Sequence, residues 1–310
     1  MSKKDQKARR HGSHRPKSPQ KSQRKTARNS GHDSGYNSGH NSGHNSGPAS
    51  DRNQIRHPAS KQDIKTGRNT DLWLFGKHPV LAALNNPARP LKRLVVTKRG
   101  ADQYLTDFSE INQNIRPLNP EIILPDILEK LLPADCVHQG IALLTSPLPG
   151  VDLADSCNIT GNGSHMVLIL DQVTDPHNVG AIIRSAAAFG AQAIITTDRH
   201  APPESGTLAK SASGALEVLP WVRVTNLSRA LDSLAEMGYW RLGLDGAAEM
   251  SIRETNFGKN IALVMGAEGR GLRKGSRAHC DALINLPIRR TVESLNVSNA
   301  AAIALYEFSG

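Results

Sequence analysis

The sequence predicts an α/β protein built around a parallel β-sheet. From about residue 72 to the C-terminus, short runs of apolar and β-branched residues alternate with helical runs, which is typical of sheets covered by helices. The run MVLILD at residues 166–171 is continuously apolar up to its final aspartate, as expected of a strand buried on both faces. Several predicted strands lead into polar, glycine-containing loops, where parallel sheets place their binding sites.

Composition divides the chain into four segments. Residues 1–70 contain very few apolar side chains and a repeated NSGH-like unit, so we expect a disordered tail that cannot offset the entropy of folding. Residues 71–147 predict a small α/β domain. Residues 148–164 form a linker rich in Pro, Gly and Ser, and residues 165–310 predict the second α/β domain.

The small domain shows its elements in order. LWLFGKHPVLAALNN indicates a strand, a turn and a helix, and KRLVVTK indicates a strand of β-branched residues. DQYLTDFSEINQ and PDILEKLL predict helices, and HQGIALLTS predicts a further strand.

The second domain alternates more regularly. After MVLILD, helices are predicted over residues 178–190, 227–238 and 296–308, and strands over 191–197, 216–224, 239–245, 260–266 and 282–287. The first and last of these helices are rich in alanine and apolar almost all round, so we expect each to have partners on more than one face.

The excess positive charge lies in the tail. Residues 1–30 contain 11 Lys and Arg and one acid, Asp5, while the other 280 residues contain 27 basic and 27 acidic side chains. The basic block is either a non-specific RNA tether, because lysine and arginine release counterions from phosphate, or a tail that aids solubility. The His-rich repeat predicts a flexible linker.

The three cysteines form no C-x-x-C pair, so we expect no disulfide scaffold, no metal site and a reducing cytoplasmic location. No apolar run approaches the roughly 18 residues of a membrane span, and we expect no membrane association.

Three loops could carry chemistry. In residues 171–190, Asn178 is placed to cap a helix, Gly180 permits a close approach of backbone or substrate, and Arg184 lies among apolar residues. Arg184 has two interpretations, an internal ion pair with Glu268 or a clamp for an anion or a ribose. His177 is interpreted as an ordinary polar loop residue.

The second loop, MGAEGRGL at residues 265–272, places Glu268 among glycines, but it matches neither the dinucleotide fingerprint nor a Walker A loop. The third, LPIRRTVESLN, leads through Ser294 and Asn296 into the last helix, which Asn296 or Ser298 can cap.

Together and in this order, DPHNVGAIIRSAAAFGA, LVMGAEGRGL and LP…VESLNVSNAAAIALYE resemble the three motifs of the SpoU family, RNA ribose 2′-O-methyltransferases of the SPOUT superfamily. KSASGALEVLPWVRVTNL between the first two motifs also resembles the family. LFGKHPVLAAL and HQGIALL resemble the ribosomal-protein-like substrate-binding domain found in many members. The combination is similar to enzymes that methylate a guanosine ribose in 23S rRNA. One position departs from the family pattern, since Arg290 stands where a glycine is usual.

The resemblance implies an RNA (guanosine-2′-O-)-methyltransferase with a parallel-sheet domain, a C-terminal trefoil knot and a homodimer. It implies S-adenosylmethionine as cofactor, held near Gly266, Leu286 and Leu295. Arg184 is placed at the reacting 2′-hydroxyl, where it holds a phosphate and stabilises the developing alkoxide, since an arginine with a pKa above about 12 is a poor base. Glu268 orients Arg184 or the cofactor loop, and Asn178, Ser294 and Asn296 support the loops and the substrate.

Two other functions fit the same residues. One is a tRNA ribose 2′-O-methyltransferase on the same fold, and the extra N-terminal domain favours ribosomal RNA over it. The other is a non-catalytic RNA-binding factor in ribosome assembly, which the joint presence of Asn178, Arg184, Glu268 and Asn296 disfavours. A nucleotide-binding dehydrogenase is excluded because the glycine fingerprint and its distal acid are missing.

Overall fold

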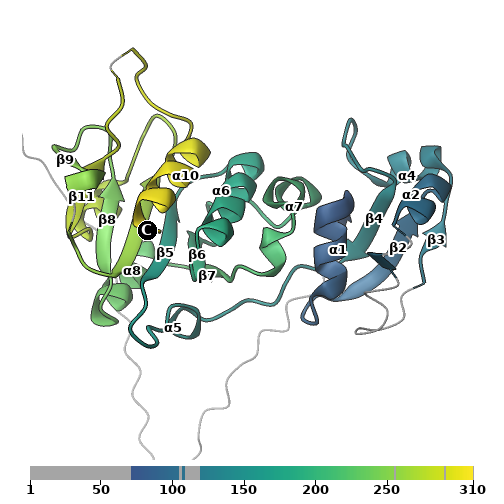
Figure 1. Cartoon of the computed structure of the whole chain (residues 1–310), viewed down its shortest axis with the longest axis horizontal. Coiled ribbons are helices and arrows are strands. Elements are labelled where there is room, and N and C mark those ends of the chain that lie inside the picture. The colour runs from purple at the N-terminus through teal and green to yellow at the C-terminus, as the bar shows by residue number, and fades with distance from the viewer. Residues whose placement is uncertain (1–70, 105–106, 109–118, 255, 290, 310) are drawn as a thin grey trace, which may run out of the picture. The chain divides into compact units, whose positions relative to one another are not determined.

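The computed structural model describes residues 71–104, 107–108, 119–254, 256–289 and 291–309 (Figure 1). The predicted tail, residues 1–70, lies outside the described residues, and so does Arg290. None of the described helices is long and apolar enough to cross a membrane.

The N-terminal part contains a four-stranded sheet in the order β1-β4-β2-β3. β4 pairs antiparallel with both β1 and β2, whereas β2 and β3 are parallel. The predicted helix over residues 102–113 is described only in part, because residues 105–106 and 109–118 lie outside the described residues. The elements are β1 Leu72–Phe75, α1 Lys77–Asn85, β2 Leu91–Val96, α2 Lys98–Gln103, β3 Glu121–Ile122, α4 Pro125–Leu131 and β4 Ile141–Thr145.

The C-terminal part contains the predicted parallel sheet. Seven strands in the order β7-β6-β5-β10-β8-β11-β9 all run in the same direction. Strand β5 lies inside the sheet between β6 and β10 and is buried at all seven positions, which confirms the prediction made from its apolar run. The strands are β5 His165–Asp171, β6 Ala193–Thr197, β7 Trp221–Val224, β8 Trp240–Leu244, β9 Met250–Ser251, β10 Asn260–Gly266 and β11 Ala282–Asn285.

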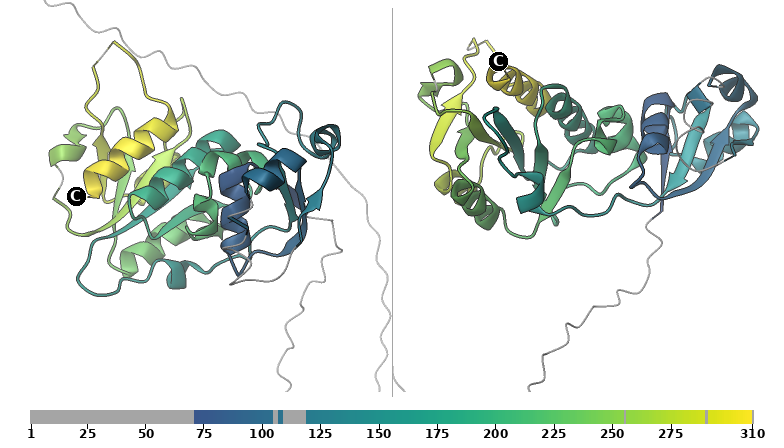
Figure 2. Two further views of the ribbon diagram at one scale, coloured as in Figure 1. Left: turned by 45° about the vertical axis from the view of Figure 1, so that its right-hand side comes forward. Right: turned by 60° about the horizontal axis from the view of Figure 1, so that its bottom comes forward.

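Helices cover both faces of this sheet (Figure 2, right). Alternate residues of β5 point to opposite faces, so Leu168 packs in one core with α6 and α10, while Ile169 packs in a second core with α8. The helices are α5 Leu153–Ser156, α6 Pro176–Ala188, α7 Gly206–Ala212, α8 Leu227–Glu236, α9 Lys274–Ala278 and α10 Val297–Phe308, with short 3₁₀ turns η1 Ala215–Glu217 and η2 Ile252–Glu254.

Two details differ from the sequence predictions. Residues 216–224 are not one strand, because η1 comes first and β7 begins only at Trp221; Pro220 lacks the N–H that a ladder needs and disfavours regular structure before it. The short helix α5 also interrupts the predicted linker, where the Asp152 side chain accepts a hydrogen bond from the Ala154 amide and caps it.

Glycines allow α7 to pack at backbone distance on two sides. A Cβ at Gly180 of α6 would lie 2.4 Å from the carbonyl oxygen of Leu208 in α7. A Cβ at Gly206 of α7 would lie 2.3 Å from the carbonyl oxygen of Trp73 in β1. The expectation of a close approach at Gly180 is therefore confirmed for backbone, and α7 connects α6 to the small domain.

A buried arginine of the small domain also contacts the second domain near α7. The Arg89 side chain is fully buried and forms ion pairs with Glu204 and Glu217. It also donates to the carbonyl oxygen of Ser146 at 3.1 Å, and the second oxygen of Glu204 accepts from the Leu148 amide at 3.0 Å. Burial alone lowers the pKa of Arg89, but the hydrogen bonds and charges of the two carboxylates outweigh it and raise the pKa above its ordinary value.

We predict that Arg89→Met destabilises the protein by about 3–5 kcal/mol, because it leaves two buried carboxylates without their cation. Urea denaturation of the purified variant measures the loss. Arg93→Met is the matched control, since the Arg93–Glu121 pair is exposed and such pairs contribute little. Equal unfolding midpoints for the two variants would contradict the role assigned to Arg89.

Candidate active site

Three polar residues from three separate motifs meet beyond the carboxyl ends of β5 and β10. The side-chain amide of Asn296 donates to Glu268 Oε1 at 2.8 Å and to Asn178 Oδ1 at 3.0 Å. The side-chain amide of Asn178 donates to the same Glu268 oxygen at 3.2 Å. The Val297 amide is a third donor to that oxygen, also at 3.2 Å. We call the residues Asn178, Glu268 and Asn296 the polar triangle.

Helix capping explains how Asn178 becomes available to the polar triangle. Asp175 caps α6, because its carboxylate accepts from the backbone amides of His177 at 3.1 Å and Asn178 at 3.3 Å. The expectation that Asn178 itself caps this helix was wrong. Its side chain lies in the first turn of α6, where it is free to reach Glu268.

Asn296 both caps α10 and donates hydrogen bonds within the polar triangle. Its Oδ1 caps α10 by accepting from the Ser298 amide at 2.9 Å and the Asn299 amide at 3.4 Å. Its Nδ2 points the other way and makes the two hydrogen bonds of the polar triangle. The cap therefore fixes the orientation of the amide that binds Glu268.

The loop that carries Glu268 folds back on itself. The Gly271 amide donates to the carbonyl oxygen of Ala267 at 2.9 Å, and Gly269 and Gly271 have positive φ angles of 74° and 62°, which glycine adopts without steric cost. A Cβ at Gly266 would lie 2.1 Å from the carbonyl carbon of Gly271. Glycine at the end of β10 is thus required by the turn that presents Glu268.

A buried carboxylate anchors the far end of that loop. Asp171, the last residue of β5, is fully buried and accepts from the Arg273 side chain at 2.6 Å and from its backbone amide at 3.2 Å. This pair was not predicted from the sequence. The signal was present, because an aspartate at the end of a continuously apolar strand must have a partner when it is buried.

Two of the predicted catalytic residues have no contact with the polar triangle. Arg184 lies on α6, about 9 Å along the helix axis from Asn178 at 1.5 Å per residue. Its side chain is exposed and makes no ion pair with Glu268 or with any other residue in the described part of the chain, so the internal ion pair is not formed. Ser294 is also exposed, and its side chain has no hydrogen bond to a described residue.

The residues expected to hold the cofactor lie at the same edge of the sheet. Gly266 ends β10, Leu286 follows β11, and Leu295 precedes the cap of α10. Each is partly exposed, and Leu286 packs against the core beneath α6 and α10. They combine apolar surface with accessible backbone at the exits of strands, which suits a nucleoside.

The thiols are poorly suited to covalent chemistry. Burial raises the pKa of both Cys157 and Cys280 to about 11. At neutral pH both thiols stay protonated, and the thiolate is the reactive form. His177 also lies outside the polar triangle, and its Nδ1 is 3.3 Å from the hydroxyl of Ser211.

Comparison with known proteins identifies both parts of the chain. Residues 165–306 match the model of the SpoU rRNA Methylase family, and residues 73–150 match that of the RNA 2′-O ribose methyltransferase substrate-binding domain. The chain is 37% identical, over 76% of its length and 93% of the relative's, to the 23S rRNA (guanosine-2′-O-)-methyltransferase RlmB of Ralstonia nicotianae. It is 36% identical, over 76% of its length and 94% of the relative's, to RlmB of Pseudomonas aeruginosa.

A further relative is longer, an uncharacterized tRNA/rRNA methyltransferase of Synechocystis sp., which is 37% identical and of which the match spans 61%. Among solved structures, the SpoU methyltransferase AviRb from Streptomyces viridochromogenes is similar, with a TM-score of 0.63 and 26% identity over 77% of this chain and 89% of that one. The same enzyme has also been solved in complex with the cofactor AdoMet, with a TM-score of 0.63 at 25% identity over 77% of this chain and 89% of that one. The chain therefore belongs to the SpoU rRNA methylase family and carries the substrate-binding domain of RNA 2′-O ribose methyltransferases.

Proposed function

We propose that the protein transfers a methyl group from S-adenosylmethionine to the ribose 2′-hydroxyl of a guanosine in 23S rRNA. The observation that carries this proposal is the polar triangle, in which all three family motifs meet through side chains of the expected types. The RlmB relatives act on 23S rRNA guanosine by their names, and the AdoMet complex of AviRb supports the choice of cofactor.

The residues present fit the cofactor. When bound, S-adenosylmethionine supplies a methyl group carried on a sulfonium sulfur. Gly266, Leu286 and Leu295 would hold it, because they combine partly exposed backbone with apolar surface at the exits of β10 and β11.

Arg184 is the residue proposed to act on the substrate. Its guanidinium is exposed and makes no ion pair within the described residues, so its charge is available to RNA. A guanidinium stays protonated in proteins, and we therefore assign it to the phosphate beside the reacting ribose and to the negative charge that develops on the 2′-oxygen.

The polar triangle is proposed to position rather than to react. Glu268 Oε1 is occupied by three donors, while Oε2 has no hydrogen-bond partner within the described residues. Glu268 thereby fixes the loop after β10, and Ser294, which has a free hydroxyl, is assigned to substrate binding.

The larger assembly is also a proposal. We infer that the C-terminal segment is threaded as a trefoil knot, as the family resemblance implies. A homodimer is supported by the outer face of α10, where Ile303 is 43% exposed and Tyr306 is 67% exposed, so the helix has apolar surface left to cover. Residues 71–147 are assigned to recognition of rRNA, and we expect the reaction to take place in the cytoplasm.

Mapping 2′-O-methylation in total RNA from cells with and without the gene tests the whole proposal. Loss of one guanosine mark in 23S rRNA is the expected result. A mark lost from tRNA instead, or no lost mark, would contradict the proposed substrate.

We predict that Arg184→Ala lowers the rate of methyl transfer roughly 100- to 1,000-fold, as removal of one charge-stabilising donor does in other enzymes. Calorimetry should find the affinity for S-adenosylmethionine largely unchanged. Arg253→Ala is the matched control, because Arg253 is an exposed arginine that belongs neither to the polar triangle nor to the proposed cofactor set. A near wild-type rate for Arg184→Ala would refute the assignment.

We predict that Glu268→Ala lowers the free energy of unfolding by about 1–2 kcal/mol, since three donors lose their acceptor, and that it also reduces methyl transfer. Glu268→Gln keeps an acceptor oxygen and should recover most of the stability. Thermal melts and rates for both variants measure the two effects. If Glu268→Ala has the melting temperature and the methyl-transfer rate of the wild type, the role assigned to the polar triangle is contradicted.

We predict that deleting residues 1–65 leaves the fold and the target nucleotide unchanged but weakens RNA binding at low salt. For every phosphate that the tail neutralises, the deletion should reduce the slope of log K against log salt by about 0.7 to 0.9. RNA affinities of the full and shortened proteins across a salt series provide the measurement. Identical slopes would mean that the tail is not an RNA tether.

A further inference from the structure

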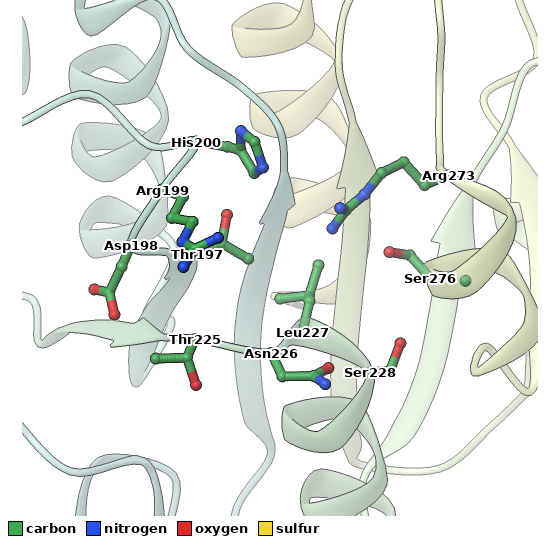
Figure 3. A pocket seen from close by; sticks show the side chains of 11 residues that line it. Thr197, Asp198, Arg199, His200, Thr225, Asn226, Leu227, Ser228, Arg273 and Ser276 are labelled. Atoms are coloured by element: carbon green, nitrogen blue, oxygen red, sulfur yellow. The ribbon is translucent and has the colours of Figure 1, made fainter. Parts of the chain in front are cut away.

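A cavity of about 600 Å³ lies at the carboxyl ends of β6 and β7 (Figure 3). Residues of α8 and α9 border it, whereas Asn178 and Asn296 begin helices on the opposite face of the sheet from α8. Thr197 at the end of β6 and Arg199 and His200 of the loop that follows form one wall. Arg273 and Ser276 face them from the other wall. None of these residues belongs to the polar triangle or to the proposed cofactor set.

The cavity is lined by more positive than negative charge. Arg199 has no partner within the described residues. The Nε of Arg273 donates a hydrogen bond to Asp171 at 2.6 Å. Its two terminal nitrogens have no hydrogen-bond partner among the described residues and extend into the cavity in Figure 3. Asp198 also lines the cavity, although its carboxylate points away from the other labelled side chains.

A buried hydroxyl in the wall has no partner. Thr197 is only 6% exposed, and its Oγ1 is without a hydrogen bond in the described part of the chain. Native proteins satisfy nearly all such groups with protein, water or ligand. Because Thr197 lines the cavity, a water or a ligand bound there is the available partner of its hydroxyl.

The start of α8 completes the wall. Asn226 caps this ten-residue helix through its side chain, and Leu227 and Ser228 of the first turn line the cavity. The first backbone amides of a helix favour negatively charged oxygens, which often are those of a phosphate. The helix end, the two arginines and the free hydroxyl all offer hydrogen-bond donors to the cavity.

We propose that this cavity binds a phosphodiester of the RNA substrate at a position that flanks the methylated nucleotide. The inference rests on the proposed function for the identity of the substrate. The arginine guanidiniums match phosphate oxygens in geometry and charge, and Arg273 connects the bound phosphate through Asp171 to the end of β5 and to the loop that carries Glu268.

The first test compares Arg199→Gln with Arg253→Gln, a control at an exposed arginine that does not line the cavity. Arg199→Gln should raise the KM for RNA about tenfold and reduce the salt slope by about 1, with little change in kcat or in calorimetric affinity for S-adenosylmethionine. The control should match wild type. An unchanged KM and slope for Arg199→Gln, or a loss of cofactor affinity without loss of RNA affinity, would overturn the proposal.

The second test uses Thr197→Val, which removes the hydroxyl and nearly preserves the shape. If the Thr197 hydroxyl donates a hydrogen bond to RNA, Thr197→Val should bind RNA more weakly than wild type. Its melting temperature should be unchanged or higher, because the variant without RNA no longer contains an unpaired buried hydroxyl. A lower melting temperature with unchanged RNA affinity would mean a structural role only, and would overturn the assignment.

Inorganic phosphate and adenosine monophosphate distinguish the source of the phosphate. Weak competition with RNA by both, abolished by Arg199→Gln, is expected of a phosphodiester site. Tight binding of the mononucleotide in the absence of RNA would identify a free-nucleotide site and reject RNA as the occupant. Wild-type protein that binds RNA in this way but transfers no methyl group would contradict the proposed function while leaving the phosphate site intact.

Discussion

One carboxylate oxygen holds the functional edge of the molecule together. Glu268 Oε1 accepts hydrogen bonds from the side chains of Asn178 and Asn296 and from the Val297 amide. These donors belong to the first turn of α6 and to the cap and first residue of α10, so a single acceptor fixes the start of two helices and the tip of a loop. Charge-assisted hydrogen bonds are stronger than neutral ones, which suits a carboxylate that accepts from three donors while it is exposed to water.

The pairing of β5 with β10 in the sheet determines the positions of the two loops that follow these strands. β5 and β10 are adjacent and parallel, with Gly266 opposite Asp171 in the register. Their carboxyl ends therefore lie side by side, and the loops that leave them cannot avoid each other. The bond from Arg273 to the buried Asp171 returns the second loop to the end of β5, so that both ends of the Glu268 loop are fixed to the same pair of strands.

The small domain is attached through a few specific partners. α7 packs on α6 through Gly180 and on β1 through Gly206, while Arg89 neutralises two buried carboxylates at the junction. A buried ion pair adds less to stability than its Coulomb energy suggests, but it tolerates few alternative arrangements. The domain assigned to RNA recognition and the domain assigned to methyl transfer thus meet at a junction with a defined geometry.

The sequence by itself determined the parallel sheet, the strongly periodic helices and the three loops, because hydrophobic periodicity and turn-forming residues are local properties of a chain. It also placed Asn178, Glu268 and Asn296 in one site, through a family resemblance. Only the tertiary structure decided what several side chains do: Asn178 and Asn296 bind Glu268, Arg184 stays free of Glu268, and Asp171 holds Arg273. Those outcomes depend on which side chains meet across separations of about a hundred residues, 90 for Asn178–Glu268 and 118 for Asn178–Asn296, and no local pattern encodes such distances.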